Sequence, residues 1–384
     1  MYPFCNVVDS IAREMVLLTR ALAPSVDAIT WFGDARLHHA DVPATFEDIP
    51  CGLGPLRGGA GWALFAARAA RTLRSRRRDF DVILAVATSS PVYDVVRVHA
   101  VTRAEQRRWP ERGGSSYRLA RARAGAAPVL HPQIAVDRFV QRLQFGVGKA
   151  GRAAVVTAEV AEDLARTFGV PAERIDVIPC AIDLERFERA RKRRAATDVD
   201  GSGRLLFLGS DFERKGLAEA LQALAGLPAY TSLTVVGTGD PRPYEALAST
   251  LGVRERVTFT GGTDAPERFL EQADLLVLPT REDVWGMAVI EALAVGVPVV
   301  TTDAAGASAV VRQSDAGIVV RSGDADAIRG AVAGLLDDPS RLGAMRQNGP
   351  PAAVAYAADA VAEKFLGTLE RAAQERRRLN GGAS

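Results

Sequence analysis

Two carboxylates stand eight residues apart in the stretch REDVWGMAVIEA, residues 281–292. Asp283 precedes Gly286 and Glu291 follows it, and the other residues after Gly286 are apolar. The apolar run before this stretch predicts a buried strand, and the run after Gly286 predicts a helix that ends at Gly296. A buried carboxylate on an apolar helix needs a polar partner. Glu291 therefore either has such a partner or lies on a solvated face of its helix.

The start of this predicted helix could also receive a phosphate. Backbone N–H groups at a helix N-terminus lack acceptors within the helix, and the helix dipole favours an anion there. Four residues supply these amides: Gly286, Met287, Ala288 and Val289.

A second candidate set follows the apolar run RLLFLGS, residues 204–210. Arg214 and Lys215 stand just after it, and Gly209 and Ser210 end the run. Two adjacent cations after a strand suit a pyrophosphate, because Arg binds in a fork and Lys acts as a point charge. Two solvated surface cations are the alternative. The P-loop spacing GxxxxGK[ST] is absent.

Gly237 belongs to a third turn, in VVGTGD, residues 235–240. The pattern is similar to the start of a dinucleotide-binding fingerprint, but the third glycine is missing and Pro241 and Pro243 follow. We therefore reject a dinucleotide site and interpret Gly237 as part of a tight turn whose backbone approaches a ligand.

Metal and disulfide chemistry find little support in the sequence. The histidines do not cluster at ligand spacing, and the three cysteines lie far apart without a CxxC motif, which fits a reducing cytoplasm. The DVD at residues 198–200 lies in a charged run and is interpreted as solvated. His99, at the end of a predicted strand, is kept as a site candidate, with structural and functional roles both open. The other histidines are His38, His39 and His131.

The second half of the chain supplies a regular pattern of elements to position these residues. Short apolar runs alternate with helical stretches, which indicates a doubly wound α/β domain with a parallel sheet covered on both faces. Ligands of such domains bind at the carboxyl ends of the strands. The runs are residues 204–210, 232–239, 256–262, 273–280, 297–302 and 317–322.

The first half predicts a less regular α/β unit. An irregular insertion is expected at residues 103–132, and the charged run 188–203 is expected to be a linker without a core. The tail from Arg376 is expected to be disordered. The predicted strands are residues 27–33, 81–90, 95–101, 153–158 and 174–179, and the predicted helices are residues 13–22 and 61–77.

Charge is unevenly distributed along the 384 residues. The net charge is only +2, which gives no reason to expect nucleic acid as a partner. Residues 61–150 nevertheless contain 17 Lys and Arg against 6 Asp and Glu. The basic stretches are residues 71–78 and 102–125, where solvated faces and contact with anionic lipid or a phosphorylated acceptor are both open. We expect neither a secretory signal nor a membrane span. We therefore predict a cytoplasmic protein that is peripheral on the inner face of the membrane.

Three stretches together resemble glycosyltransferase family 4, a family of retaining enzymes with the GT-B fold. They are LGSDFERKGLAEALQALAGLP, EQADLLVLPTREDVWGMAVIEALAVGVPVVTT and GIVV. Within the family, the first is similar to the bacterial lipopolysaccharide core glucosyltransferases. Residues 156–187 look like the crossover between the two domains of the family, whereas the first 150 residues are less similar.

The resemblance implies two Rossmann-like domains that face each other across a cleft. Residues 1–185 would bind the acceptor, and residues 200–350 would bind a nucleotide-sugar, expected to be a UDP-hexose. Residues 351–376 would form a helix returning toward the first domain. No metal cofactor is implied. The acceptor would be a glycan or lipid-linked glycan, which could carry phosphate.

The resemblance also implies roles for individual residues. Arg214 and Lys215 would neutralise the donor diphosphate, Asp283 would face the sugar hydroxyls, and Glu291 the ribose. His99 would lie on the acceptor side. The remaining donor-binding residues would be Gly209, Ser210, Gly237, Gly286, Met287, Ala288 and Val289.

Two departures from the family pattern affect these expectations. The first acid is Asp283 where Glu is commoner, which leaves the sugar open. Asp9 and Ser10 stand where the family has glycines, so either the first strand is missing or the start is placed too late. A nucleotide-sugar 2-epimerase, which needs no acceptor, and a non-catalytic module that binds nucleotide-sugar or lipid are the alternative functions.

Overall fold

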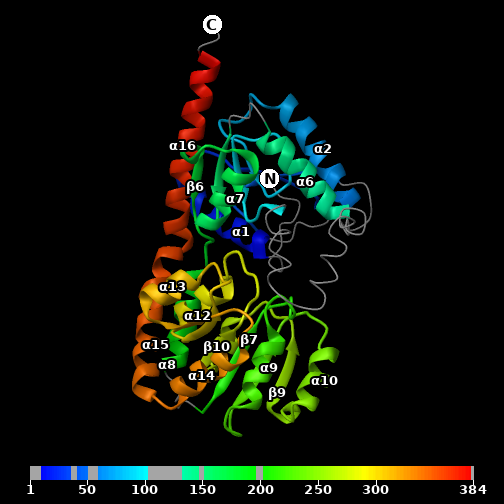
Figure 1. The fold of residues 1–384 in the computed structure, drawn as a ribbon. Coiled ribbons are helices and arrows are strands. Elements are labelled where there is room, and N and C mark those ends of the chain that lie inside the picture. The colour runs from blue at the N-terminus through cyan, green and yellow to red at the C-terminus, as the bar shows by residue number, and fades with distance from the viewer. Residues whose placement is uncertain are drawn as a thin grey trace. The chain divides into compact units, whose positions relative to one another are not determined.

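A computed structural model describes residues 10–35, 41–50, 59–102, 132–146, 151–195 and 202–381. These residues form two compact units (Figure 1). Unit 1 contains the described residues up to Ala181 and again from Ala358 onward, and unit 2 contains the described residues from Ile182 to Ala357. The chain therefore leaves unit 1, builds all of unit 2, and then returns to unit 1.

Unit 2 is built on a parallel sheet of six described strands in the order β12-β11-β10-β7-β8-β9. Each strand coincides with one of the apolar runs in the sequence, so the prediction of a doubly wound parallel sheet is confirmed. The strands are β7 (Arg204–Leu208), β8 (Ser232–Val236), β9 (Val257–Gly261), β10 (Leu275–Leu278), β11 (Val299–Thr302) and β12 (Gly317–Val320).

Helices cover this sheet in two sets. In one set α9 packs with α10 and α14, and in the other α12 packs with α8 and α15. The bounds are α8 (Leu184–Ala195), α9 (Leu217–Ala225), α10 (Arg242–Thr250), α11 (Glu267–Leu270), α12 (Met287–Val295), α13 (Ser308–Ser314), α14 (Ala325–Leu336) and α15 (Pro339–Ala353). Short 3-10 helices lie at Arg254–Arg256 and Val354–Tyr356. Strands β10 and β11 are completely buried, because helices cover both of their faces.

The strand order fixes where a ligand would bind in unit 2. Strand β7 is the first strand of the sheet, and its neighbours β8 and β10 lie on opposite sides of it. The order of the strands therefore reverses between β7 and β10, and the helices that follow these strands, α9 and α12, belong to the two different sets that cover the sheet. Open parallel sheets bind their ligands at such a switch point.

Unit 1 contains a parallel sheet in the order β3-β4-β5-β6 and a parallel pair of strands, β1 and β2. The sequence predicted five of these strands but missed β2, whose residues TFED read as polar. The strands are β1 (Thr30–Gly33), β2 (Thr45–Asp48), β3 (Leu84–Val86), β4 (Val95–Val98), β5 (Arg152–Val155) and β6 (Ile175–Val177). The helices are α1 (Ser10–Leu22), α2 (Gly59–Ser75), α6 (Pro132–Phe145), α7 (Ala158–Phe168) and α16 (Ala358–Gly381), with 3-10 turns at Ala23–Ser25 and Ala172–Arg174.

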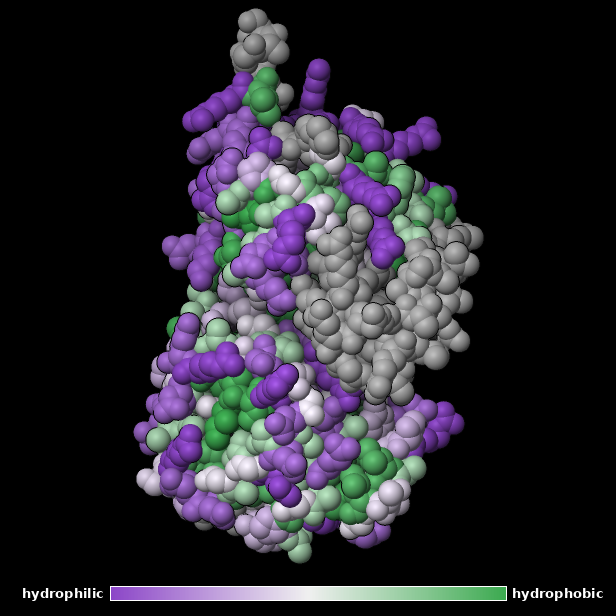
Figure 2. Space-filling view, in the orientation of Figure 1, coloured by the Kyte–Doolittle hydropathy of each residue, from purple (hydrophilic) through white to green (hydrophobic). Residues whose placement is uncertain are grey.

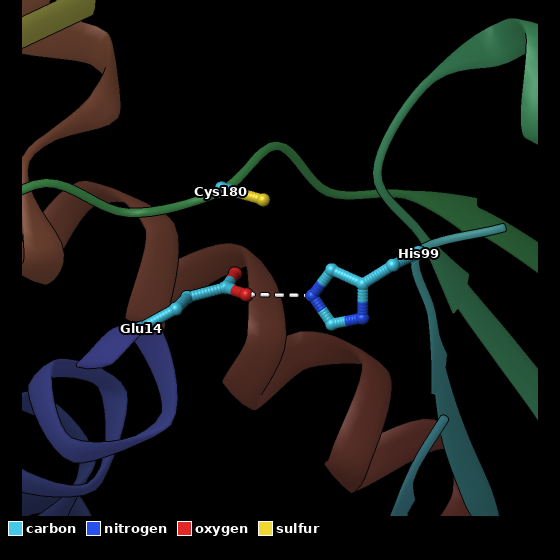
Figure 3. A group of neighbouring side chains, drawn as sticks. All are labelled: Glu14, His99 and Cys180. Atoms are coloured by element: carbon cyan, nitrogen blue, oxygen red, sulfur yellow. Dashed lines mark hydrogen bonds and ion pairs between the residues drawn. The ribbon is translucent and has the colours of Figure 1, made fainter. Parts of the chain in front are cut away.

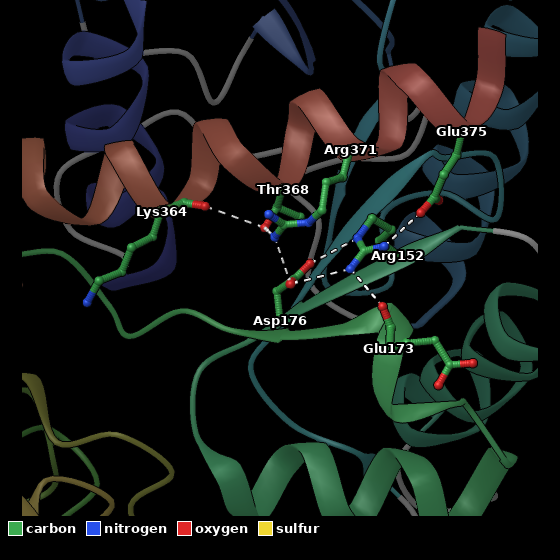
Figure 4. Close-up of polar contacts among 7 residues, drawn as sticks. All are labelled: Arg152, Glu173, Asp176, Lys364, Thr368, Arg371 and Glu375. Atoms are coloured by element: carbon green, nitrogen blue, oxygen red, sulfur yellow. Dashed lines mark hydrogen bonds and ion pairs between the residues drawn. The ribbon is translucent and has the colours of Figure 1, made fainter. Parts of the chain in front are cut away.

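Helix α16 belongs to unit 1 through both apolar and ionic contacts. Val361 and Phe365 are fully buried in its core. Arg152 of β5 donates to Asp176 of β6 at 3.0 Å and to Glu375 of α16 at 2.8 Å (Figure 4). The disorder expected from residue 376 onward is wrong for residues 376–381, because α16 continues to Gly381.

The charged run expected to be a linker also forms structure up to residue 195. Helix α8 occupies residues 184–195, and its Phe187 and Ala190 are buried in the core of unit 2. Arg194 is buried as well and donates to the carbonyls of Leu270 and Glu271, both at 3.1 Å. The many Arg and Lys residues of this helix conceal its buried side in the sequence.

Several expectations fall outside the described residues. These are the start of the chain before Ser10, the insertion between residues 103 and 131, and the DVD at residues 198–200. Among the described helices, none is both long and apolar enough for a membrane crossing. In the view of Figure 2, hydrophilic side chains cover most of the described surface, with smaller hydrophobic patches between them.

Candidate functional site

The loops after β7 and β10 touch at the switch point of unit 2. Gly216 ends the first loop with φ +79°, a conformation that side chains rarely adopt. A Cβ atom at this position would lie 2.0 Å from the carbonyl oxygen of Pro279, in the second loop. Only glycine lets the two loops approach this closely, so Gly216 brings the basic loop onto the acidic one.

Hydrogen bonds then lock the two loops together. The backbone N–H of Arg281 donates to the carbonyl of Arg214 at 2.8 Å, and the guanidinium of Arg214 donates to the carbonyl of Glu282 at 2.7 Å. The same guanidinium donates to Asp211 at 2.9 Å. The side chain of Arg214 is therefore held in place from both loops.

Lys215 and Asp283, two of the predicted site residues, form an ion pair across the loops. Both side chains are only 13% exposed. Nearby charges interact more strongly where water is partly excluded. The structure thus places a cation and a carboxylate, 68 residues apart in sequence, at one point where a ligand could exchange with either partner.

The helix start at Gly286 has the predicted form, with one exception. Gly286 adopts φ +96° and directly precedes α12, and Gly296 ends the helix with φ +79°. The N–H of Val289 donates to the carbonyl of Gly286 at 2.9 Å. The expectation of a free amide is therefore wrong for Val289, while Met287 and Ala288 lie half-buried in the first turn.

Glu291 lies inside unit 2. It is 5% exposed, in a helix whose residues from Val289 to Val295 are all buried. The alternative in which Glu291 occupies a solvated face of its helix is therefore wrong. A carboxylate kept in such surroundings requires compensation by polar groups.

The loop after β8 adjoins the loop after β7. The N–H of Gly209 donates to Val236 at 2.9 Å, and the N–H of Thr238 donates to the hydroxyl of Ser210 at 3.3 Å. A Cβ atom on Gly237 would lie 2.1 Å from the carbonyl oxygen of Gly209. The backbone at Gly237 therefore packs tightly against another turn of the protein. The expected approach of this turn to a ligand stays a prediction.

A buried ion pair beneath these loops was not anticipated from the sequence. Arg281 contacts Glu219 of α9, and both side chains are largely buried. The pair ties the first turn of the helix after β7 to the loop after β10. An acid in the otherwise apolar start of α9 was a usable signal, of the same kind that singled out Glu291.

His99 lies in unit 1, immediately after β4 (Figure 3). Its Nε2 atom is 2.9 Å from an oxygen of Glu14, which comes from α1. The other oxygen of Glu14 pairs with Arg97, which is fully buried. Burial opposes ionisation of Glu14, but the charge of Arg97 and the bond to His99 outweigh it and lower its pKa from 4.5 to about 2.

Cys180 completes this cluster, and ligand atoms of Glu14, His99 and Cys180 lie within 4.8 Å of one another. Arg97 already pairs with Glu14 and lies 3.7 Å from the Cys180 sulfur, so a cation occupies the space between them. Burial, followed by the charge of Glu14, raises the pKa of Cys180. The donor set therefore suits a neutral thiol beside a guanidinium better than a metal ion, which needs a thiolate.

The sequence contained signals for this cluster as well. Glu14 interrupts the apolar stretch of α1, and Arg97 interrupts the apolar strand β4. Both are charges in segments that must be buried, and such charges require partners.

Two family models match the chain in succession. Residues 12–186 match Glycosyltransferase Family 4, and residues 188–351 match Glycosyl transferases group 1. Among sequence relatives, the lipopolysaccharide glucosyltransferase WaaG of Escherichia coli (strain K12) is 32% identical over 191 residues, 47% of this chain and 51% of that protein. D-inositol 3-phosphate glycosyltransferase of Nocardia farcinica (strain IFM 10152) is 32% identical over 213 residues, 51% of this chain and 47% of that protein. The matched stretch spans about half the length of these relatives.

Solved structures resemble the whole chain. WaaG, a glycosyltransferase involved in lipopolysaccharide biosynthesis, has a TM-score of 0.75 at 24% identity, covering 95% of this chain and 97% of that one. Sucrose-phosphate synthase of Thermosynechococcus elongatus has a TM-score of 0.72 at 19% identity, covering 97% and 94%. Anabaena HepE in complex with UDP has a TM-score of 0.63 at 15% identity, covering 96% and 98%.

The two Rossmann-like units with parallel sheets define the GT-B fold, as predicted. The chain belongs to the glycosyltransferases that the two models describe, with a family 4 domain followed by a group 1 domain. The resemblance of its motifs to glycosyltransferase family 4 is confirmed.

Proposed function

We propose that the protein transfers a hexosyl group from a UDP-linked sugar to a glycan or glycolipid acceptor with retention of configuration. The observation that carries this proposal is the Lys215–Asp283 pair at the switch point of unit 2, beside Arg214. UDP is the nucleotide in the complex of the structural neighbour HepE. The similarity to WaaG, a lipopolysaccharide glucosyltransferase, supports a lipopolysaccharide-type acceptor. The proposal places the protein on the cytoplasmic face of the membrane.

In this proposal the chain's own cations stabilise the leaving diphosphate. Arg214 is held by the carbonyl of Glu282 and by Asp211, so its guanidinium is oriented before a donor arrives. Lys215 would move its charge from Asp283 to the diphosphate, which frees Asp283 to accept hydrogen bonds from sugar hydroxyls. A fixed charge aimed at a leaving group, such as that of Arg214, lowers the barrier because it needs no reorganisation. With two cations in these positions, the proposed mechanism uses no metal ion.

The remaining residues would hold other parts of the donor and the acceptor. Glu291 is proposed to face the ribose, and the amides of Gly286, Met287 and Ala288 to face phosphate or sugar. His99, fixed by Glu14, is proposed to contact the acceptor. The turns at Gly209, Ser210 and Gly237 would bound the donor pocket with backbone atoms.

The test is turnover of a panel of UDP-hexoses by three proteins: the parent, Lys215→Ala and Lys192→Ala. Lys192 is an exposed lysine of α8 and serves as the matched control. Removing one of the two cations that stabilise the leaving diphosphate should slow UDP release about 100-fold or more, whereas the control should match the parent. Equal turnover by the parent and the Lys215 variant would refute the assignment. Release of a free C2-epimer in the absence of acceptor would instead identify an epimerase.

A further inference from the structure

A hollow of about 1010 Å³ lies at the amino ends of the strands in unit 1. The end of α2, the segment before β4, Gly151 before β5, and the last turns of α16 form its walls. His99 follows the carboxyl end of β4, so the hollow lies at the opposite edge of the sheet from the His99 cluster. It therefore needs an explanation separate from the proposed acceptor site.

Two partly buried arginines share one carboxylate in this hollow. Arg77 pairs with Asp94, and Nη1 of Arg376 lies 3.7 Å from the other oxygen of the same carboxylate. Their side chains are 29% and 15% exposed. Asp94 also accepts a hydrogen bond from the N–H of Ile83 at 2.7 Å. Burial, and after it the charge of Arg77, lower the pKa of Arg376, as expected where two cations face one anion.

The neighbouring acids do not neutralise the excess positive charge of Arg77 and Arg376. Glu375 lines the hollow, but it pairs with Arg152, which also pairs with Asp176 (Figure 4). Asp79 pairs with Arg76. The charge of Asp81 acts on Arg376, whose guanidinium also donates to the Asp81 backbone carbonyl at 3.0 Å.

Two further arginines stand at the rim of the hollow. Arg74 and Arg78 line it and are exposed, and neither has an ion-pair partner among the described residues. Basic residues at the end of a helix are often no more than solvated charges that complement its dipole. That reading accounts for Arg74, but it does not account for Arg77 and Arg376, which are mostly buried and converge on Asp94.

We propose that this hollow binds a phosphate or pyrophosphate ester at a site independent of the sugar donor. Two arginines that share one carboxylate, and two exposed arginines at the rim, give the hollow an excess of positive charge that suits an anion of two or more charges. Guanidinium forks match phosphate oxygens. Val92, Ala372 and the exposed Leu379 offer an apolar wall for the organic part of the ester. The same chemistry is presented by a soluble phosphate ester and by a lipid headgroup.

The probe is inorganic pyrophosphate, titrated calorimetrically at low ionic strength, where screening is weakest. All proteins carry Lys215→Ala, which weakens the proposed donor site, so the result does not depend on the proposed function. The test variant adds Arg74→Ala and Arg78→Ala. The matched control adds Arg71→Ala and Arg377→Ala, two exposed arginines that remove the same charge but do not line the hollow.

Loss of charge-assisted hydrogen bonds should weaken pyrophosphate binding about tenfold per arginine in the test variant and leave the control nearly unchanged. A second arm measures competition by phosphatidylglycerol vesicles, with phosphatidylcholine vesicles as the blank. Competition that depends on the rim arginines identifies a lipid headgroup as the source, and its absence identifies a soluble ester. Undetectable pyrophosphate binding, or equal weakening in test and control, overturns the proposal.

Discussion

Replacing Glu14 with glutamine tests whether the cluster beneath His99 is held by charge. The substitution keeps the shape of the side chain but removes the carboxylate that both Arg97 and His99 contact. Arg97 would remain buried with two carbonyl partners, Ile178 at 2.5 Å and Pro179 at 3.0 Å, and no anion at Glu14. We expect unit 1 to lose stability without losing its fold.

The size of the loss follows from the titration of Glu14. Its pKa falls from 4.5 to about 2 on folding, which corresponds to about 3 kcal/mol of stabilisation at neutral pH. Breaking a buried ion pair by removing one partner costs about 3–5 kcal/mol, so the two estimates agree. A domain with a total stability of about 5–15 kcal/mol would remain folded in most of this range.

Hydrogen exchange of the backbone amides in β4 and β5 measures this loss, because exchange from core strands reports opening free energies segment by segment. The strands of unit 2, β7 and β10, serve as the internal control. The expected result at pH 7 is faster exchange in β4 and β5 of the variant and unchanged exchange in unit 2. Identical protection of β4 and β5 in both proteins would refute the reasoning.

The lowered pKa of Glu14 also determines the direction in which its stabilising effect changes with pH. Because the pKa of Glu14 is lower in the folded protein, its stabilisation is fully present above pH 4.5 and is lost as the pH falls toward about 2. The difference in thermal midpoint between parent and variant should therefore be constant from pH 7 to about 5 and shrink below that. A difference that stays constant to pH 2.5 would show that the charge of Glu14 does not cause the effect.

Two further predictions concern unit 2. Arg281→Ala should lower the unfolding free energy of unit 2, measured in urea, by about 3–5 kcal/mol, because Glu219 is left buried without its cation. Arg281→Met combined with Glu219→Leu should recover most of the loss. A double variant no more stable than the single one would contradict this. Gly216→Ala should lower the thermal midpoint more than Gly252→Ala. Both glycines have positive φ, but only at Gly216 does an added Cβ atom meet a backbone oxygen, that of Pro279 at 2.0 Å. Equal shifts would show that the contact between the loops is unimportant.

The architecture of unit 2 could be predicted because its strands are buried on both faces. A continuous apolar run such as LLVL in β10 marks such a strand without reference to any other part of the chain. Strand β2, by contrast, has half-buried or exposed residues throughout and carries Glu47 and Asp48, so its sequence does not distinguish it from a loop. The strand order that creates the switch point was likewise not contained in any local pattern.

In the candidate site, too, local sequence identifies the residues, whereas their pairing depends on contacts between distant segments. Arg214, Lys215 and Asp283 could be nominated because each follows a predicted strand, where parallel sheets place their ligands. That Lys215 pairs with Asp283 depends on β7 and β10 being neighbours. The partnership of Glu14 with Arg97, 83 residues away, also depends on packing and could only be anticipated as a need for some partner.

Because the chain returns to unit 1 through α16, unit 2 can be completed during synthesis before unit 1. When Ala357 has been made, every residue of the compact part of unit 2 exists, whereas unit 1 still lacks the helix that carries Val361 and Phe365 into its core. Synthesis of unit 1 therefore begins first and ends last, and the apolar face that α16 covers stays exposed in the interval. A truncation that removes α16 would accordingly damage the N-terminal unit.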